Sequence, residues 1–185
     1  YWLLADQPPP PIASFAPDEV TYISTLSKCL TPGLRVAFVL MRDAQEREQF
    51  LAALRSFALM APPLTAALAT QWILDGSATE LMEGVRKEAR ERHWMARDIL
   101  AGRYSGSGDG LHVWLELPGY WDSLQLAHAA SKEGITVMPA QAFTGDAAAD
   151  SAPVNSIRIS LGSIKERSQL QAGLQKLSDL LARCP

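Results

Sequence analysis

Lys28 is the residue of this 185-residue chain whose surroundings best suit covalent chemistry. It lies in a turn-rich segment between two apolar runs, after the hydroxyls of Thr25 and Ser27 and seven residues before Arg35. Two hydroxyls and a guanidinium can bind one anion together, and a nearby lysine amine can then attack an electrophile that the anion holds. A phosphorylated aldehyde has both features. These residues therefore indicate a site for a cofactor of that class.

The two apolar runs around Lys28 are predicted to be strands. Residues 20–26 are rich in β-branched and aromatic side chains, and residues 34–41 are nearly all apolar. Such runs are typical of strands buried on both faces, as in a mostly parallel sheet covered by helices. Two strands cannot form that sheet alone, so we expect its other strands to lie upstream. The chain starts at Tyr1 rather than at methionine, which also leads us to expect a longer protein.

Helical spacing replaces the apolar runs after residue 43. It predicts an amphipathic helix with Phe50, Leu51, Leu54 and Phe57 on its inner side, followed by a largely apolar helix at 64–74. A long charged helix is expected over 79–101. Beyond it, the pattern predicts a compact α+β unit with strands at 112–117, 135–138 and 156–161, a loop at 140–153, and helices at 123–133 and 164–183. The tryptophans at 72, 94, 114 and 121 are expected to pack in the core or between domains.

Composition excludes several classes of function for this chain. It has 17 basic and 20 acidic side chains and a net charge of −3. The chain therefore lacks the excess of positive charge that binds nucleic acid or an anionic membrane. DNA could be bound only through a module absent from this chain. The apolar stretches fall far short of the roughly 20 residues of a membrane span. Cys29, Cys184 and the three histidines lack metal-ligand spacing, so we expect no metal site and a reducing, cytoplasmic compartment.

The segment SKCLTPGLR, residues 27–35, resembles the cofactor-lysine segment of fold-type-I aminotransferases that depend on pyridoxal phosphate. That family has a Ser-Lys pair, a short spacer and a Pro-Gly-Leu-Arg sequence. The resemblance implies that Lys28 is the catalytic Schiff-base lysine for pyridoxal 5′-phosphate. It also implies that Thr25, Ser27 and Arg35 bind the cofactor phosphate. Tyr1 matches the family's tyrosine that hydrogen-bonds the phenolic oxygen of the cofactor.

The resemblance extends over essentially the whole chain. The segment NSIRISLG, residues 155–162, is similar to the strand that carries the family's substrate-binding arginine. This implies that Arg158 grips the carboxylate of an amino acid with a bidentate fork, although an arginine in an alternating strand is by itself more often a surface residue. Residues 61–64, 71–76 and 111–118 are similar to the aminotransferase-like region of MocR-type regulators in the GntR superfamily. Those regulators carry an N-terminal winged helix-turn-helix.

The resemblance also implies how the chain is organised. Residues 1–77 would be the C-terminal part of the α/β large domain that binds pyridoxal phosphate, 78–102 a long linking helix, and 103–185 a small α+β C-terminal domain. Family members form homodimers, so a homodimer is implied. Two features depart from the family pattern. Ala37 stands where glycine is common, and the aspartate that pairs with the pyridine nitrogen would precede Tyr1. This chain alone is therefore expected to be inactive.

Three functions are compatible with these observations. The leading hypothesis is the amino-acid-sensing, aminotransferase-like domain of a MocR-type transcription regulator. The alternative is the C-terminal part of a class I/II aminotransferase, an enzyme that depends on pyridoxal phosphate. The third hypothesis is an interaction domain that binds no cofactor.

Overall fold

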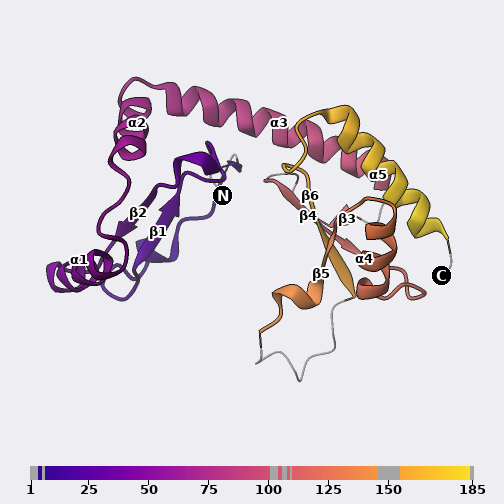
Figure 1. The fold of residues 1–185 in the computed structure, drawn as a ribbon, viewed down its shortest axis with the longest axis horizontal. Helices are drawn as coiled ribbons and strands as arrows, with labels where there is room; N and C mark the ends of the chain where they lie inside the picture. The colour runs from indigo at the N-terminus through magenta and orange to yellow at the C-terminus, as the bar shows by residue number, and fades with distance from the viewer. Residues whose placement is uncertain are drawn as a thin grey trace. The chain divides into compact units, whose positions relative to one another are not determined.

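The computed structural model of the chain describes residues 4–5, 7–100, 104–105, 108, 110–145 and 155–183. It divides into two compact units, Tyr1–Lys87 and Glu88–Pro185, each of which contains helices and strands (Figure 1). The boundary between the units lies within helix α3 (Ser77–Leu100). Among the described residues, no helix has the length and apolar character required to cross a membrane.

The first unit contains an antiparallel pair of strands, β1 (Tyr22–Thr25) and β2 (Ala37–Leu40) (Figure 1). Both strands were predicted from their apolar runs, and they pair with each other in the antiparallel direction. Consecutive parallel strands need a crossover of a dozen or more residues, usually a helix. The connection over residues 26–36 is shorter than that, so the chain returns beside β1 in the opposite direction.

Two helices follow β2, namely α1 (Ala44–Ala58) and α2 (Pro63–Leu74), and both were predicted. The Asp43 carboxylate caps α1 by accepting a 2.7 Å hydrogen bond from the Glu46 amide. The expected burial of α1 is not observed, because the helix has no fully buried residue and Phe57 is 92% exposed. Leu64, Ile73 and Leu74 of α2 are also exposed. A two-stranded ribbon offers too little surface to cover the apolar sides of both helices.

The second unit contains an antiparallel sheet with the strand order β3-β4-β6-β5. The central strands, β4 (His112–Glu116) and β6 (Ser156–Ser160), confirm the strands predicted at 112–117 and 156–161. The edge strands are short. β5 (Met138–Pro139) covers only the end of the predicted strand at 135–138, and β3 (Tyr104–Ser105) was not predicted, because two residues carry no periodic signal.

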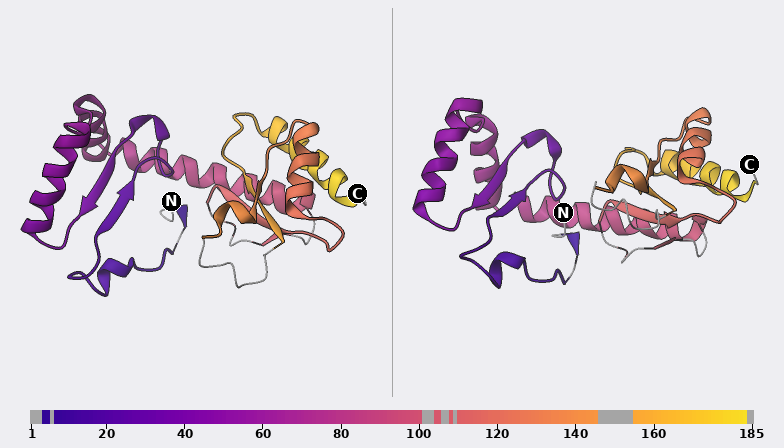
Figure 2. Two further views of the ribbon diagram at one scale, coloured as in Figure 1. Left: turned by 60° about the horizontal axis from the view of Figure 1, so that its bottom comes forward. Right: turned by 90° about the horizontal axis from the view of Figure 1, so that it is seen from below.

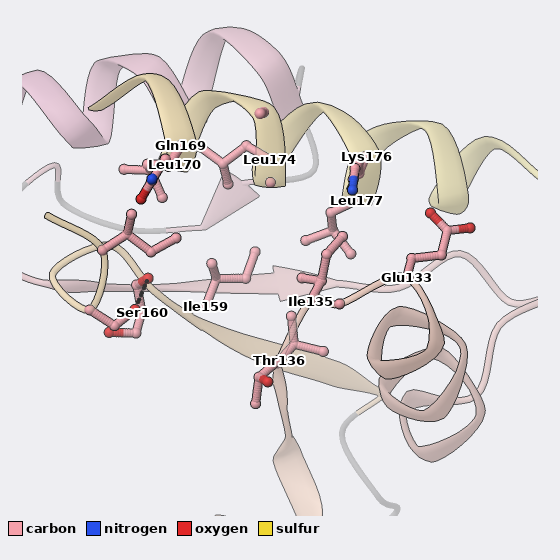
Figure 3. Close-up of a pocket in the computed structure, with 16 residues that line it drawn as sticks. Glu133, Ile135, Thr136, Ile159, Ser160, Gln169, Leu170, Leu174, Lys176 and Leu177 are labelled. Carbon is pink, nitrogen blue, oxygen red and sulfur yellow. Dashed lines mark hydrogen bonds between the residues drawn. The ribbon is translucent and has the colours of Figure 1, made fainter. Parts of the chain in front are cut away.

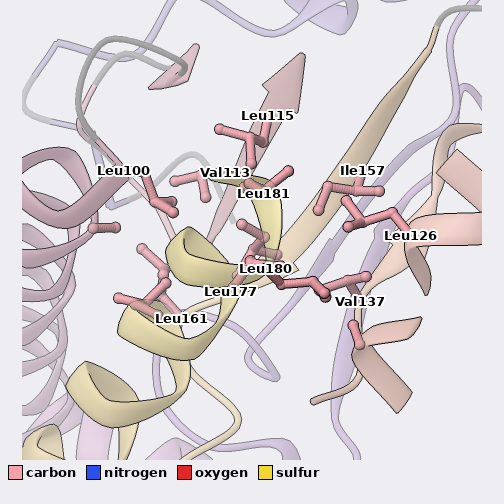
Figure 4. Close-up of a cluster of buried hydrophobic side chains, with 14 of the residues drawn as sticks. Leu100, Val113, Leu115, Leu126, Val137, Ile157, Leu161, Leu177, Leu180 and Leu181 are labelled. Carbon is pink, nitrogen blue, oxygen red and sulfur yellow. The ribbon is translucent and has the colours of Figure 1, made fainter. Parts of the chain in front are cut away.

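Helices α4 (Ser123–Lys132) and α5 (Arg167–Ala182) lie on one side of this sheet (Figure 2). Together with the end of α3 they enclose the core, whose side chains interdigitate in Figure 4. Burial of each large aliphatic side chain contributes about 1.5–3 kcal/mol. The core residues labelled there are Leu100, Val113, Leu115, Leu126, Val137, Ile157, Leu161, Leu177, Leu180 and Leu181.

Arg92 ties α3 to the segment between β6 and α5. Its guanidinium is buried and donates hydrogen bonds to the carbonyl oxygens of Leu161 at 2.7 Å, Ile164 at 2.5 Å and Lys165 at 2.8 Å. Its Nε donates to Glu88 at 2.7 Å. The side chain thus provides partners for three carbonyl groups that leave the sheet without strand neighbours, which fixes the chain between β6 and α5.

Within the predicted loop at 140–153, a short 3-10 helix forms, η4 (Ala140–Phe143). The hydroxyl of Ser123 donates a 2.8 Å hydrogen bond to Oε1 of Gln141, which anchors η4 to the start of α4. Residues 146–154 lie outside the described part of the chain.

Candidate functional site

The loop between β1 and β2 carries the predicted cofactor residues. Thr25 ends β1, and the pairing continues past it, because the Leu26 amide donates a 3.3 Å hydrogen bond to the Val36 carbonyl. The next pair in this register is Ser27 and Arg35. The antiparallel ribbon therefore brings the hydroxyl of Ser27 and the cationic residue Arg35 to the mouth of one loop, where Thr25 adds a second hydroxyl.

Lys28 lies in a turn that is closed by a 3.0 Å hydrogen bond from the Leu30 amide to the Leu26 carbonyl. The side chain of Lys28 is exposed, whereas the next residue, Cys29, is buried with its Sγ 3.6 Å from the Thr25 carbonyl oxygen. The buried side chain of Cys29 thus anchors the turn, while the side chain of Lys28 remains exposed. The turn presents the Lys28 amine to solvent or to a ligand.

Arg35 adopts the left-handed conformation, with φ 53° and ψ 37°. It follows a 3-10 turn, η3 (Pro32–Leu34), which is capped by the Thr31 hydroxyl and anchored by the buried side chain of Leu34. A left-handed residue with a β-carbon costs about 1 kcal/mol, and such conformations cluster at functional sites. The backbone bend directs Arg35 outward instead of continuing the turn.

The side chains in this loop fit a phosphate group. In the part of the chain that the structure describes, neither Lys28 nor Arg35 forms an ion pair with a carboxylate. Both cations are therefore available to an external anion, and two hydroxyls stand beside them. Guanidinium and hydroxyl donors match the acceptor oxygens of a phosphate monoester. Tyr1, the remaining predicted cofactor residue, lies outside the described residues.

Arg158 belongs to the second unit, at the centre of β6, where it aligns with Trp114 on β4 and Met138 on β5. Its neighbours Ile157 and Ile159 point into the core, so Arg158 lies on the opposite face of the sheet. The side chain is half-buried. The sheet therefore presents Arg158 on the face that does not pack against α4 and α5.

Two aromatic rings accompany Arg158 on this face. Its guanidinium carbon lies 4.4 Å from the centroid of the Phe143 ring, and Trp114 meets Phe143 edge-on at 5.3 Å with an interplanar angle of 75°. The Nε of Arg158 is buried without a hydrogen-bond partner among the described residues. A buried N–H group without a partner costs about 1–3 kcal/mol, so this edge of the guanidinium is suited to an acceptor from outside the chain.

A separate cavity of about 580 Å³ lies between α5, the segment 133–137 and the end of β6 (Figure 3). Ile135, Leu170 and Leu174 form its apolar lining, and Gln169 and Lys176 add polar atoms. The predicted cofactor and carboxylate residues do not line it. The described residues contain no group of three or more histidine, cysteine, aspartate or glutamate side chains that could hold a metal ion.

Comparison with known sequences finds relatives of two kinds, although no family model matches the chain. The chain is 33% identical over 182 residues, 98% of its length, to the uncharacterized HTH-type transcriptional regulator YdeF of Bacillus subtilis. It is 27% identical over 168 residues, 88% of its length, to the 2-aminoadipate transaminase of Thermus thermophilus. These matches cover 38% and 41% of the two proteins, so the chain spans about two fifths of the length of the curated relatives it matches.

Solved structures reproduce the fold over almost the whole chain. The α-aminoadipate aminotransferase LysN of Thermus thermophilus, complexed with N-(5′-phosphopyridoxyl)-L-leucine, superposes with a TM-score of 0.81 at 26% identity. The match covers 98% of this chain and 48% of that one. A Thermus thermophilus aspartate aminotransferase variant has a TM-score of 0.82 at 14% identity, which supports the fold alone. The chain has the fold of part of an aminotransferase. The resemblance inferred from the sequence is therefore confirmed.

Two of the tryptophans expected to be core or interdomain packing residues lie outside the core. Trp94 is 68% exposed and Trp114 is 38% exposed. The alternation of β4 was the signal that could have placed Trp114, because its neighbours Val113 and Leu115 fill the core and Trp114 must then point the other way. Sequence reasoning also missed the contact between Phe143 and Arg158, which arises from the fold of η4.

Proposed function

We propose that the full-length protein containing this chain is a MocR-type transcription regulator of the GntR superfamily that senses an amino acid through pyridoxal 5′-phosphate. The observation that carries this proposal is the 33% identity over 98% of the chain to an HTH-type transcriptional regulator. The cofactor is supported by the match to LysN, whose structure contains a phosphopyridoxyl derivative of leucine.

In this proposal Lys28 binds the cofactor aldehyde covalently, and Thr25, Ser27 and Arg35 hold the phosphate at the mouth of the β1–β2 loop. Tyr1 would donate a hydrogen bond to the phenolic oxygen. When bound, the cofactor supplies an electron-withdrawing ring that activates an amino acid at its α-carbon. The exposed amine of Lys28 can hold or release a proton at Nζ, and the guanidinium of Arg35, which forms no ion pair with a described carboxylate, offsets the phosphate charge.

Arg158 would bind the carboxylate of the amino acid. A carboxylate accepts two parallel hydrogen bonds from one edge of a guanidinium, and Nε is one of the two donors on such an edge. The buried Nε of Arg158 has no partner within the described residues, which supports this role. The Phe143 ring contacts the guanidinium without supplying a hydrogen-bond acceptor to it.

The organisation that goes with this function is also part of the proposal. Residues 1–77 would end the large domain, α3 would be the linking helix, and 103–185 would form the small domain of a cytoplasmic homodimer. A winged helix-turn-helix elsewhere in the protein would bind DNA. Binding of the amino acid to the protein loaded with pyridoxal 5′-phosphate would be the signal that reaches the winged helix-turn-helix.

A free-standing aminotransferase that depends on pyridoxal phosphate is the second candidate. It is favoured by the 27% identity to a 2-aminoadipate transaminase over 88% of the chain. In such an enzyme Lys28 would also move the proton between the α-carbon of the amino acid and the aldehyde-derived carbon of the cofactor, the two carbons that flank the transferred nitrogen.

The test uses the full-length protein with added pyridoxal 5′-phosphate, borohydride reduction and peptide mass spectrometry. We expect a phosphopyridoxyl adduct on Lys28 that is absent from Lys28→Ala and retained in Lys132→Ala, a matched control on an exposed lysine of α4. Amino-acid-dependent DNA binding would then establish the regulator, and sustained transamination with a 2-oxo acid would establish the enzyme. A protein without any adduct would be a cofactor-free interaction domain.

A further inference from the structure

We propose that Phe143 and Trp114 are positioning residues for Arg158, which they hold so that its Nε edge faces the ligand carboxylate. The inference rests on the proposed carboxylate role of Arg158 and extends it to two residues without an assigned role. It concerns residues of the second unit only, where all the contacts lie.

The guanidinium carbon of Arg158 lies over the Phe143 ring. The 4.4 Å separation between the guanidinium carbon and the ring centroid is within the range of a favourable cation–π interaction. The N–H groups of a guanidinium lie in its plane and point outward from its edges. The ring offers no lone-pair acceptor, so it restrains the side chain without taking the place of the carboxylate oxygens that these donors would bind.

An acidic partner would restrain Arg158 in a different way. A carboxylate on the same sheet face would form a fork with the guanidinium and compete directly with an external carboxylate. Glu116 lies on this face of β4, yet no ion pair joins it to Arg158 in the described structure. Among the residues that the structure describes, Arg158 thus contacts the Phe143 ring while its Nε has no hydrogen-bond partner, as a carboxylate-binding arginine requires.

Trp114 supports this arrangement from the neighbouring strand. It aligns directly with Arg158 in the β4–β6 register and meets the Phe143 ring edge-on at 5.3 Å. Edge-to-face pairs are favoured over parallel sandwiches, so Trp114 restricts the tilt of the Phe143 ring. The hydrogen bond from Ser123 to Gln141 fixes the start of η4 two residues earlier. Phe143 is therefore held both through its backbone and through its ring.

The test measures amino-acid binding to the full-length protein loaded with pyridoxal 5′-phosphate, by the change in cofactor absorption. The probes are L-leucine, L-2-aminoadipate and L-aspartate, each beside its α-carboxamide. We expect Phe143→Leu to weaken binding of the amino acids about threefold to tenfold and to leave binding of the amides unchanged. Trp114→Leu should act in the same direction with a smaller effect.

Conservative variants and a matched control separate positioning from folding. Phe143→Tyr keeps an aromatic face and should restore binding to within about twofold of the unmodified protein. Phe57→Leu removes a ring that is 92% exposed in α1 and should change nothing.

Each remaining outcome counts against a specific statement. If Phe143→Leu weakens the amino acids and the amides equally, the ring has a general structural role and the positioning proposal is wrong. If Phe143→Leu binds the amino acids as well as the unmodified protein does, the proposal is also wrong, while the proposed function stands. If no probe alters the absorption of a protein that carries the cofactor on Lys28, the amino-acid-binding function itself fails.

Discussion

The carboxylate of Glu88 accepts three hydrogen bonds from Arg167, which lies 79 residues later in the chain. Two come from Nε at 3.1 Å and one from Nη2 at 2.5 Å, and Arg92 donates a further bond to the same carboxylate at 2.7 Å. The hydrogen bonds from Arg167 and then from Arg92 lower the pKa of Glu88 to about 2. The second unit therefore contains a carboxylate that stays ionised well into the acid range.

This ionisation predicts a specific loss of stability in acid. The pKa of Glu88 falls from an ordinary 4.5 to about 2 on folding, so its contribution is complete above about pH 4.5 and is lost as the pH falls towards 2. For a partly exposed side chain we expect about 1 kcal/mol after solvent screening. Denaturant unfolding across this range should show a smaller acid loss in Glu88→Gln than in the unmodified chain. Glu46 also has a pKa of about 2, but both proteins share it. Equal losses would contradict the prediction.

Replacement of Arg92 should destabilise the second unit strongly. Arg92→Leu would leave the carbonyl groups of Leu161 and Ile164 without their donor and Glu88 without one of its two arginines. Loss of a buried, hydrogen-bonded charge typically costs about 3–5 kcal/mol. Arg97→Leu, on an exposed position of the same helix, should cost less than about 1 kcal/mol. The two values can be compared by urea unfolding monitored by circular dichroism, and similar losses would show that the carbonyl contacts contribute little.

Truncation of a buried leucine in the second unit should lower stability much more than truncation of an exposed leucine in the first unit. Leu115 has no exposed surface, so Leu115→Ala should cost about 3 kcal/mol through lost burial and a cavity. Leu64 in α2 is 81% exposed in this chain, and Leu64→Ala should change stability by less than about 0.5 kcal/mol. Thermal unfolding of the two variants provides the comparison. A large effect at Leu64 would indicate that α2 is covered by another surface.

The left-handed conformation of Arg35 predicts that glycine and valine at this position will affect the stability of the loop differently. Arg35→Gly removes the β-carbon that disfavours a φ of 53°, so local stability should change by less than about 1 kcal/mol while affinity for pyridoxal phosphate in the full-length protein falls. Arg35→Val places a β-branched side chain there and should open the loop. Hydrogen exchange of the Leu26 amide, which pairs with Val36, reports that opening. Equal exchange in both variants would show that the backbone is not strained.

Much of this fold follows from local patterns in the sequence. The composition of 112–117 and the alternation at 156–161 predicted β4 and β6, and helical spacing predicted α1 to α5 to within a few residues. Strand direction and burial did not follow, because an apolar run such as that of β2 gives no information about its partner. The Phe143–Arg158 contact joins a 3-10 turn to a strand across the sheet, a tertiary relationship that no local pattern encodes.

The single helix α3 limits how this protein can be divided and recombined. The boundary between the units falls between Lys87 and Glu88, inside 24 continuous helical residues, so a cut there would create two frayed helix ends with eight orphaned backbone groups. Gly76, with a φ of +87° immediately before the helix, marks a natural break in the backbone. A chimera that exchanges the second unit between relatives should therefore be joined at Gly76, so that all of α3 is inherited from one parent.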